Sequence, residues 1–167
     1  MTGKPVGLLL DSFDINYQYF FAQKIDPGFD KFLEYYGIRI LPGLVIDANN
    51  QRIAIQSNQG GYQMQNIVNY PLIPMVQDLN KNASMVRNLD GIGLPFVSPI
   101  EVGNNQDLKI DIVAKSSKKS WMKPSMMSVN PHGTNFNPAK EDTMGPFNLT
   151  VIIEPKPRVS WKAYYAD

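Results

Sequence analysis

The most regular pattern of hydrophobic and polar positions lies within residues 26–47. Apolar side chains recur there at helical spacing, so they would share one face of a helix and leave the charged residues on the other. These apolar residues are Phe29, Phe32, Leu33 and Tyr36. We expect an amphipathic helix that Asp26 caps and Gly37 ends. Two short apolar strands should follow it, at residues 38–40 and 44–46.

A continuous apolar run occupies residues 6–10, between Pro5 and Asp11. Such a run is typical of a strand buried on both faces of an α/β sheet, and we place it at the centre of the sheet. Asp11 and Ser12 would then lie at the carboxyl end of this strand, where open α/β sheets usually hold their ligands. Residues 13–25 follow neither a helical nor a strand period, so we expect an irregular insert there.

The rest of the chain predicts mainly strands and loops. Alternation at residues 52–56 predicts a hairpin partner for the strand at 44–46. Residues 57–69 are rich in Gln, Asn and Gly and should form a surface loop. We expect a short helix at residues 84–89 and a long irregular loop over 122–142. The remaining expected strands cover residues 92–97, 108–114, 147–154 and 161–165.

These elements together predict one domain over residues 1–167. Its expected fold is α/β, a Rossmann-like three-layer domain with a mainly parallel sheet and added β-hairpin strands. A chain of 167 residues can hold a sizeable core, since a domain near 150 residues buries roughly 70% of its unfolded surface. Because an apolar run begins almost at once, we also expect the chain to be an excised piece of a longer protein.

Charge and cysteine content exclude several classes of function. The 16 basic and 15 acidic residues give a formal net charge of +1, and no basic run is longer than Lys118-Lys119. Nucleic acid is therefore not an expected partner. The chain has no cysteine, which excludes disulfides, zinc–thiolate sites and thiol nucleophiles. No stretch approaches the ~20 apolar residues of a membrane span.

Few residues are candidates for catalysis. Asp11, Asp14 and Asp47 could gather at one edge of the expected sheet and bind a cation or act as acid and base. Aspartates that end strands more often cap turns, and we prefer that interpretation. His132, the single histidine, lies in a Pro/Gly loop without an acidic neighbour. No serine-hydrolase or phosphate-loop motif occurs, so we expect no enzyme activity, no metal and no cofactor.

A binding site has better support than a catalytic one. Aromatic and amide side chains mix in the polar loops, a combination that can stack on and hydrogen-bond a sugar or a peptide. The mixture comprises Tyr17, Tyr19, Gln59, Tyr62, Gln63 and Tyr70. The competing interpretation is that these aromatic rings fold back as loop anchors. The candidate ligand-binding residues are Asp11, Ser12, Asp47, Gln59, Gly60, Gly61, Tyr62 and Tyr70.

Several short motifs follow one another in a characteristic order. They are LLLDS at 8–12, GFDKFLEYYGIRI at 28–40, GLVID at 43–47, Gly60-Gly61, Tyr70-Pro71, SMVRNLDGIGLPFVSPI at 84–100 and, more loosely, KSSKKSW at 115–121 and GPFNLTVIIE at 145–154. In this order the chain resembles the extracytoplasmic domain of the gliding-motility-associated ABC-transporter auxiliary family. Each motif is weak alone, so the specificity lies in their succession.

The resemblance implies a non-enzymatic auxiliary or substrate-binding-like module of an ABC transporter complex of the gliding-motility type. It implies a periplasmic or otherwise extracytoplasmic location, with a parent protein anchored in the cytoplasmic membrane and with a permease or sister subunit as partner. The family's fold is related to that of class I glutamine amidotransferases, whose cysteine nucleophile this chain lacks. Two alternatives stay open: a carbohydrate- or small-molecule-binding domain and, more weakly, a carboxylate-dependent hydrolase.

Overall fold

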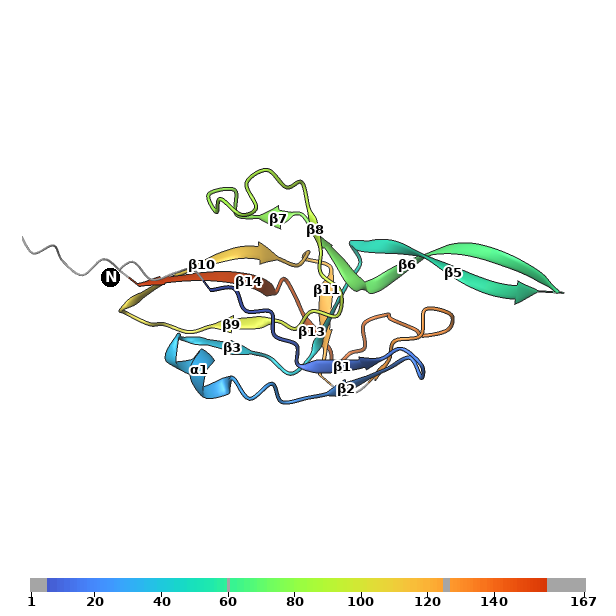
Figure 1. Ribbon diagram of the computed structural model, residues 1–167, viewed down its shortest axis with the longest axis horizontal. Coiled ribbons are helices and arrows are strands. Elements are labelled where there is room, and N and C mark those ends of the chain that lie inside the picture. The colour runs from blue at the N-terminus through green and yellow to red at the C-terminus, as the bar shows by residue number, and fades with distance from the viewer. Residues whose placement is uncertain (1–5, 60, 125–126, 156–167) are drawn as a thin grey trace, which may run out of the picture.

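The computed structural model describes residues 6–59, 61–124 and 127–155. These residues form five small sheets and one short helix (Figure 1). Every strand pairing among them is antiparallel. The expected α/β Rossmann-like domain with a mainly parallel sheet is therefore wrong, because the described part of the chain is nearly all β. The strand expected at residues 161–165 lies outside it.

The apolar run at residues 6–10 does not form the expected central strand. The run has no strand partner, and the Leu9 side chain is 96% exposed. Parallel strands also need a crossover of a dozen or more residues, usually a helix. The helix α1 (Asp30–Tyr35) has 6 residues, and the chain turns directly after it into β3 (Ile38–Ile40). This geometry suits an antiparallel partner, and β3 pairs with β9 (Ile100–Val102).

Helix α1 itself is confirmed, although it is shorter than expected and buries only one of its residues, Leu33. Gly37 ends it in the left-handed conformation, with a φ of 73°. The expected cap is wrong, since Asp26 Oδ1 accepts from the backbone N–H of Gly28 at 2.8 Å. Asp26 therefore shapes the turn before the helix, and α1 begins without a side-chain cap.

Residues 13–25 form a hairpin instead of an irregular insert. Strand β1 (Phe13–Asn16) pairs with β2 (Phe21–Lys24), and β12 (Met127–Ser128) adds to the outer side of β2. The turn between them is closed by Asn16 Oδ1, which accepts from the backbone N–H groups of Gln18 and Tyr19 at 3.0 Å each. Phe13 and Ile15 do alternate with Asp14 and Asn16 as in a strand, but the consecutive aromatic residues 19–21 obscure this period.

Strand β4 (Leu44–Asp47) is confirmed and is buried at every position. Its expected hairpin partner at residues 52–56 is wrong. It pairs instead with β11 (Ser120–Lys123), and β13 (Thr143–Met144) continues that sheet. A two-residue turn after Asp47 leads the chain away from this sheet into the next strand.

The following segment makes the longest hairpin of the described chain. Strand β5 (Asn50–Gln59) pairs along its length with β6 (Tyr62–Val76), so the surface loop expected at residues 57–69 is wrong. Figure 1 shows the hairpin projecting from one end of the molecule. Amide side chains do not prevent strand pairing, because the backbone ladder supplies the hydrogen bonds. We call residues 53–59 and 61–69 the arm.

The remaining elements close the body of the protein. Strands β10 (Leu108–Lys115) and β14 (Asn148–Pro155) confirm the expectations there, and β7 (Asp78–Leu79) pairs with the other edge of β10. Of the strand expected at 92–97, only β8 (Ile92–Gly93) forms. Residues 84–89 form turns in place of a helix, and 122–142 are irregular apart from short strand segments.

The core consists of two hydrophobic clusters that share strand β4. Leu44 and Ile46 enter the first cluster, and Val45 between them enters the second. This alternation is the period of two of a β-strand with apolar neighbours on both faces. Strand β6 also reaches both clusters, through Tyr70 and Leu72 in the first and Val76 in the second. Strand β4 thus lies between the two hydrophobic clusters and contributes side chains to both.

Candidate functional site

Asp47 lies at the end of β4 and is 1% exposed. Its Oδ1 accepts from the Ser117 hydroxyl at 2.6 Å and from the Asn49 backbone N–H at 2.8 Å. Its Oδ2 accepts from the Ser117 backbone N–H at 2.8 Å. A buried carboxylate is stable only when such donors compensate for lost solvation. Asp47 therefore fixes two turns, as strand-ending aspartates commonly do.

Two buried serines extend the contacts of Asp47 into the neighbouring strands. Ser120 Oγ donates to the Ser117 carbonyl at 2.8 Å, so its oxygen is free to accept from Ser116 Oγ at 2.7 Å. Ser116 Oγ in turn accepts from the Phe147 backbone N–H at 2.7 Å. We call Asp47, Ser116, Ser117, Ser120 and Phe147 the Asp47 junction.

The Asp47 junction joins three of the motifs that carry the family resemblance. GLVID supplies Asp47, KSSKKSW supplies the serines, and GPFNLTVIIE supplies Phe147. A backbone bond from Gly145 N–H to the Ser120 carbonyl, at 2.8 Å, adds a further tie. These motifs therefore hold β4, β11 and the start of β14 together, which is a structural role.

Asp11, Ser12 and Asp14 do not share hydrogen bonds with Asp47. Asp11 and Asp14 are exposed. Ser12 is buried, and its backbone carbonyl accepts from the Ile25 N–H at 2.9 Å, which closes the base of the β1–β2 hairpin. His132 is exposed in its loop, where its backbone N–H donates to Asn130 Oδ1 at 2.9 Å.

Tyr70 is an anchor of the first hydrophobic cluster. Its side chain is 5% exposed, and its hydroxyl donates to the Val129 carbonyl at 2.5 Å. Its ring meets the edges of Phe96 and Phe136 at centroid distances of 6.2 and 5.8 Å. Burial, with a smaller contribution from Tyr17, raises the pKa of Tyr70 to about 12. This tyrosine is folded back into the core, as the competing interpretation of the aromatic mixture supposes.

The other predicted residues lie at the tip of the arm. Gln59 ends β5 and is the register partner of Tyr62, whose side chain is 77% exposed. Gly61 has a φ of 85°, a value that favours glycine. Gly60 lies outside the described residues. Figure 1 shows this tip far from β1 and from the body, so the structure does not gather the eight candidate residues into one site.

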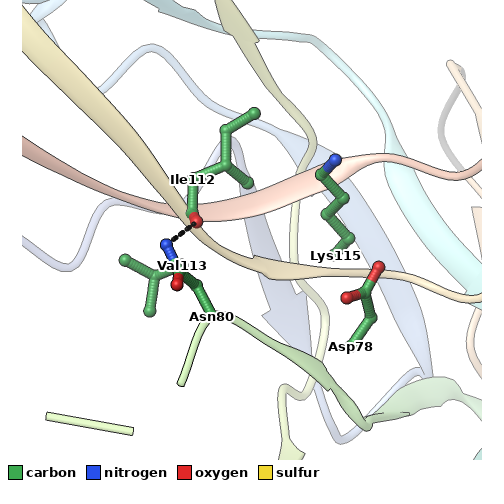
Figure 2. Close-up of a pocket in the computed structure, with 5 residues that line it drawn as sticks. All are labelled: Asp78, Asn80, Ile112, Val113 and Lys115. Atoms are coloured by element: carbon green, nitrogen blue, oxygen red, sulfur yellow. Dashed lines mark hydrogen bonds between the residues drawn. The ribbon is translucent and has the colours of Figure 1, made fainter. Parts of the chain in front are cut away.

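The described residues also form surface hollows elsewhere, among them the following two. The first, of about 170 Å³, lies beside β7 and β10, where Asp78 and Lys115 are register partners (Figure 2). Asn80 Nδ2 donates there to the Ile112 carbonyl at 3.2 Å. The volume is below the roughly 300 Å³ at which ligand pockets begin. No predicted site residue lines this hollow.

The second hollow, of about 360 Å³, lies between α1 and β9. An exposed ion pair lines it, with Arg39 Nη2 2.6 Å from Glu101 Oε2. No candidate residue takes part here either. Across the residues the structure describes, no group of three or more His, Asp or Glu side chains is placed to hold a metal ion. Those residues also contain no helix with the length and hydropathy to cross a membrane.

The arm was not predicted from the sequence to be an exposed apolar surface. No Asp, Glu, Lys or Arg occurs from Ile53 to Gln77, the longest such stretch of the chain. Three large apolar side chains of the arm are exposed: Tyr62 at 77%, Met64 at 48% and Ile67 at 71%. Gly60-Gly61 between two alternating runs is a hairpin signal that could have revealed the arm.

Comparison with known proteins supplies one match. The model of a protein family described as an ABC-type uncharacterized transport system matches residues 1–158. No curated protein and no solved structure matches the chain.

Proposed function

Since the chain belongs to this ABC-type uncharacterized transport system family, we propose that it is a non-enzymatic auxiliary component that assembles with other transporter subunits through its arm. The expected partners are a permease or a sister subunit. The proposal includes the extracytoplasmic location and the gliding-motility branch, for which the motif resemblance is the support.

The single observation that carries this proposal is the projecting, uncharged arm. Contiguous exposed apolar surface on a soluble domain is typical of an interaction site. Interface cores are depleted of charge and enriched in Tyr and Met, and the arm exposes Tyr62 and Met64 without a charged residue from Ile53 to its end. A two-stranded projection also reaches away from the body, so a partner can contact both of its faces (Figure 1).

The two faces of the arm differ in composition. Residues paired across an antiparallel ladder lie on the same face. Ile53 pairs with Val68, and Ser57 pairs with Met64, so one face is mainly apolar. Gln56 pairs with Gln65 on the other face, which is rich in amides and also holds the exposed Ile67 opposite Ala54. The apolar face is continuous with the first hydrophobic cluster through Ile53, so a partner on it would extend the core of the protein.

The proposal is tested by recovering transporter subunits with a tagged copy of the chain. A shortened arm keeps Ala54 and Ile67, which are register partners, and replaces residues 55–66 by Asn-Gly, a preferred two-residue hairpin turn. We expect the intact arm to recover the subunits and the shortened arm to lose them. Equal recovery with the shortened arm would reject the arm as the contact.

A milder pair of variants controls for exposed apolar area. Tyr62→Ser with Met64→Ser changes the arm, and Tyr35→Ser with Met144→Ser removes side chains of similar exposure, 75% and 54%, from the body. Only the arm pair should reduce recovery of the subunits. A similar loss of recovered subunits with both pairs would indicate that recovery depends on exposed apolar area in general and not on the arm.

A second candidate function, sugar or peptide binding, is favoured by the turn of the β1–β2 hairpin. Tyr17 and Tyr19 are 67% and 73% exposed there, beside the amide groups of Asn16 and Gln18. Exposed rings next to amides can stack on a sugar and hydrogen-bond its hydroxyls. A saturable thermal shift with an oligosaccharide panel, lost in Tyr19→Ala, would support it. No shift with any member of the panel would end it.

A further inference from the structure

We propose that the partner of the arm is the arm of a second copy of this chain, with the outer edges of the two β5 strands paired antiparallel. The inference rests on the proposed function in one respect, that the arm is an assembly element. It identifies the sister subunit as a twin of this chain.

The first observation is that the arm lacks a third strand. Among the described strands, β5 pairs only with β6. Strand β6 gains a further partner, β8, only at Met75 and Val76, near the base of the hairpin. A two-stranded hairpin alone is marginally stable in water, and three or more strands are needed for independent stability. Pairing with a twin would give the arm four strands.

The second observation is that the edge of β5 carries none of the usual protection within the arm, beyond Arg52. Exposed edge strands are normally guarded by charges, prolines or bulges against pairing with other chains. From Ile53 to Gln59, β5 has neither a charge nor a proline, and its ladder is regular there. Strand β6 is equally free of charge and proline from Tyr62 to Asn69, but Pro71 and Pro74 follow at its base, where β8 also pairs with its outer edge. The open edge of β5 is therefore the better pairing edge.

The third observation is that this edge is self-complementary. In a two-fold pair each residue faces a symmetry-related position on an identical strand, so a charged strand would bring like charges together. Strand β5 presents amides and a hydroxyl instead, at Gln56, Asn58 and Ser57. Each of these groups both donates and accepts hydrogen bonds. An acidic or basic partner segment would find no counter-charge on residues 53–59.

The pairing also extends the apolar face of the arm. Ile53 and Ile55 lie on the same face as Val68 and Met64. In a four-stranded sheet the isoleucines of the two copies would be central, flanked by Val68 and Met64 of each copy. This arrangement covers apolar side chains that a single hairpin leaves partly exposed.

The first test measures self-association of the full chain by sedimentation. We expect a concentration-dependent dimer whose dissociation constant rises about tenfold or more in Gln56→Lys/Asn58→Lys, because the added charges oppose one another across the edge. The matched control is Gln63→Lys/Gln65→Lys, on the same face but on β6, at the register partners of the same residues. It should weaken the dimer much less. Loss of the dimer in the control alone would overturn the assignment to β5.

The second test uses the absence of cysteine from the chain. Single cysteines at positions 54 to 58 are oxidised one at a time, with Asn135→Cys on the exposed body as control. A two-fold axis on β5 should give disulfide-linked dimers concentrated at one position and falling off on either side, since directly opposed Cβ atoms lie about 5 Å apart. Cross-linking no greater than in the control would overturn the inference.

The outcomes separate this inference from the proposed function. A chain that stays monomeric while its arm recovers a different transporter subunit contradicts the inference and keeps the proposed function. A dimer that recovers no other transporter subunit supports the inference and contradicts the proposed assembly with a transporter complex.

Discussion

The carboxylate of Asp47 accepts two hydrogen bonds from a single residue, Ser117, 70 positions further along the chain. One comes from the hydroxyl and one from the backbone N–H, at 2.6 and 2.8 Å. This pair of bonds fixes the turn before β11 against the end of β4, so the two strands enter their ladder in register. Because both carboxylate oxygens of Asp47 accept hydrogen bonds, replacing this residue removes more than one hydrogen bond.

Asp47→Ala should lower the free energy of unfolding by about 2 to 4 kcal/mol, because it leaves the partly buried donors of Ser117 and Asn49 unpaired. Urea unfolding measures the change. Ser117→Ala should cost less, since its backbone N–H still donates, and the double variant should be less than additive. Asp14→Ala, at an exposed position, is the control and should stay within about 0.5 kcal/mol of the parent. Additive losses would show that the two side chains do not act together.

Gly145→Ala should destabilise the Asp47 junction. A Cβ at this position would lie 2.0 Å from Ser120 Oγ, which is held by its own hydrogen bonds and cannot move aside cheaply. Overpacking of this kind costs roughly 1 to 3 kcal/mol. Gly133→Ala, where a Cβ meets nothing within 4 Å, is the matched control. The melting temperatures of the two variants are compared, and we expect Gly145→Ala to melt at the lower temperature. Equal melting temperatures would contradict the crowding at Gly145.

Tyr70→Phe should cost about 1 to 3 kcal/mol at neutral pH, because the buried Val129 carbonyl loses its donor. The variant should also change the alkaline limb of stability. The pKa of Tyr70 is raised from 10.0 to about 12 in the folded protein, so its contribution is complete below pH 10 and is lost as the pH rises towards 12. Unfolding curves from pH 9 to 12 should therefore fall more steeply for the parent than for Tyr70→Phe. Tyr19→Phe, at an exposed position, is the control and should change stability at neutral pH by less than about 0.5 kcal/mol.

The ion pair of Lys123 and Asp142, 2.8 Å apart, should stabilise the protein above pH 4 and weaken in acid. Burial opposes ionisation of Asp142, but the hydrogen bonds from Lys123 and the Ala139 N–H outweigh it and hold the pKa of this carboxyl below its usual 3.8. Stability from a lowered pKa is present above the unfolded value and is lost as the pH falls through the folded one. Asp142→Asn should be less stable at pH 7 and lose less between pH 4 and 2. Asp107→Asn, at an exposed position, is the control and should change stability at pH 7 by less than about 0.5 kcal/mol.

Local elements were predictable where a residue pattern is enough to define them. Helix α1 follows from apolar spacing, and β4, β10 and β14 follow from apolar or alternating runs that the structure buries at least in part. The pairing of strands was not predictable, because β4 is completed by β11 and not by its neighbour in sequence. Register depends on contacts such as Asp47 with Ser117, which no local period reveals.

The candidate site was predictable only in its parts. Asp47 ends a strand and accepts turn hydrogen bonds, as its position suggested, and Tyr70 is buried as a large aromatic residue often is. The polar run at residues 57–69 was misinterpreted because amide-rich composition is typical of loops, whereas the backbone ladder of the hairpin does not depend on side-chain polarity.

Strand β4 lies between the two hydrophobic clusters, so the two clusters should unfold cooperatively. Detaching β4 would expose Leu44 and Ile46 on one side and Val45 on the other. Neither hydrophobic cluster can therefore unfold while the other stays buried. Amide protons of β4 and β11 should therefore exchange with solvent only through global unfolding, whereas those at the tip of the arm should exchange by local fraying. Hydrogen exchange should therefore show two populations of amide protons, slowly exchanging ones in β4 and β11 and rapidly exchanging ones at the tip of the arm.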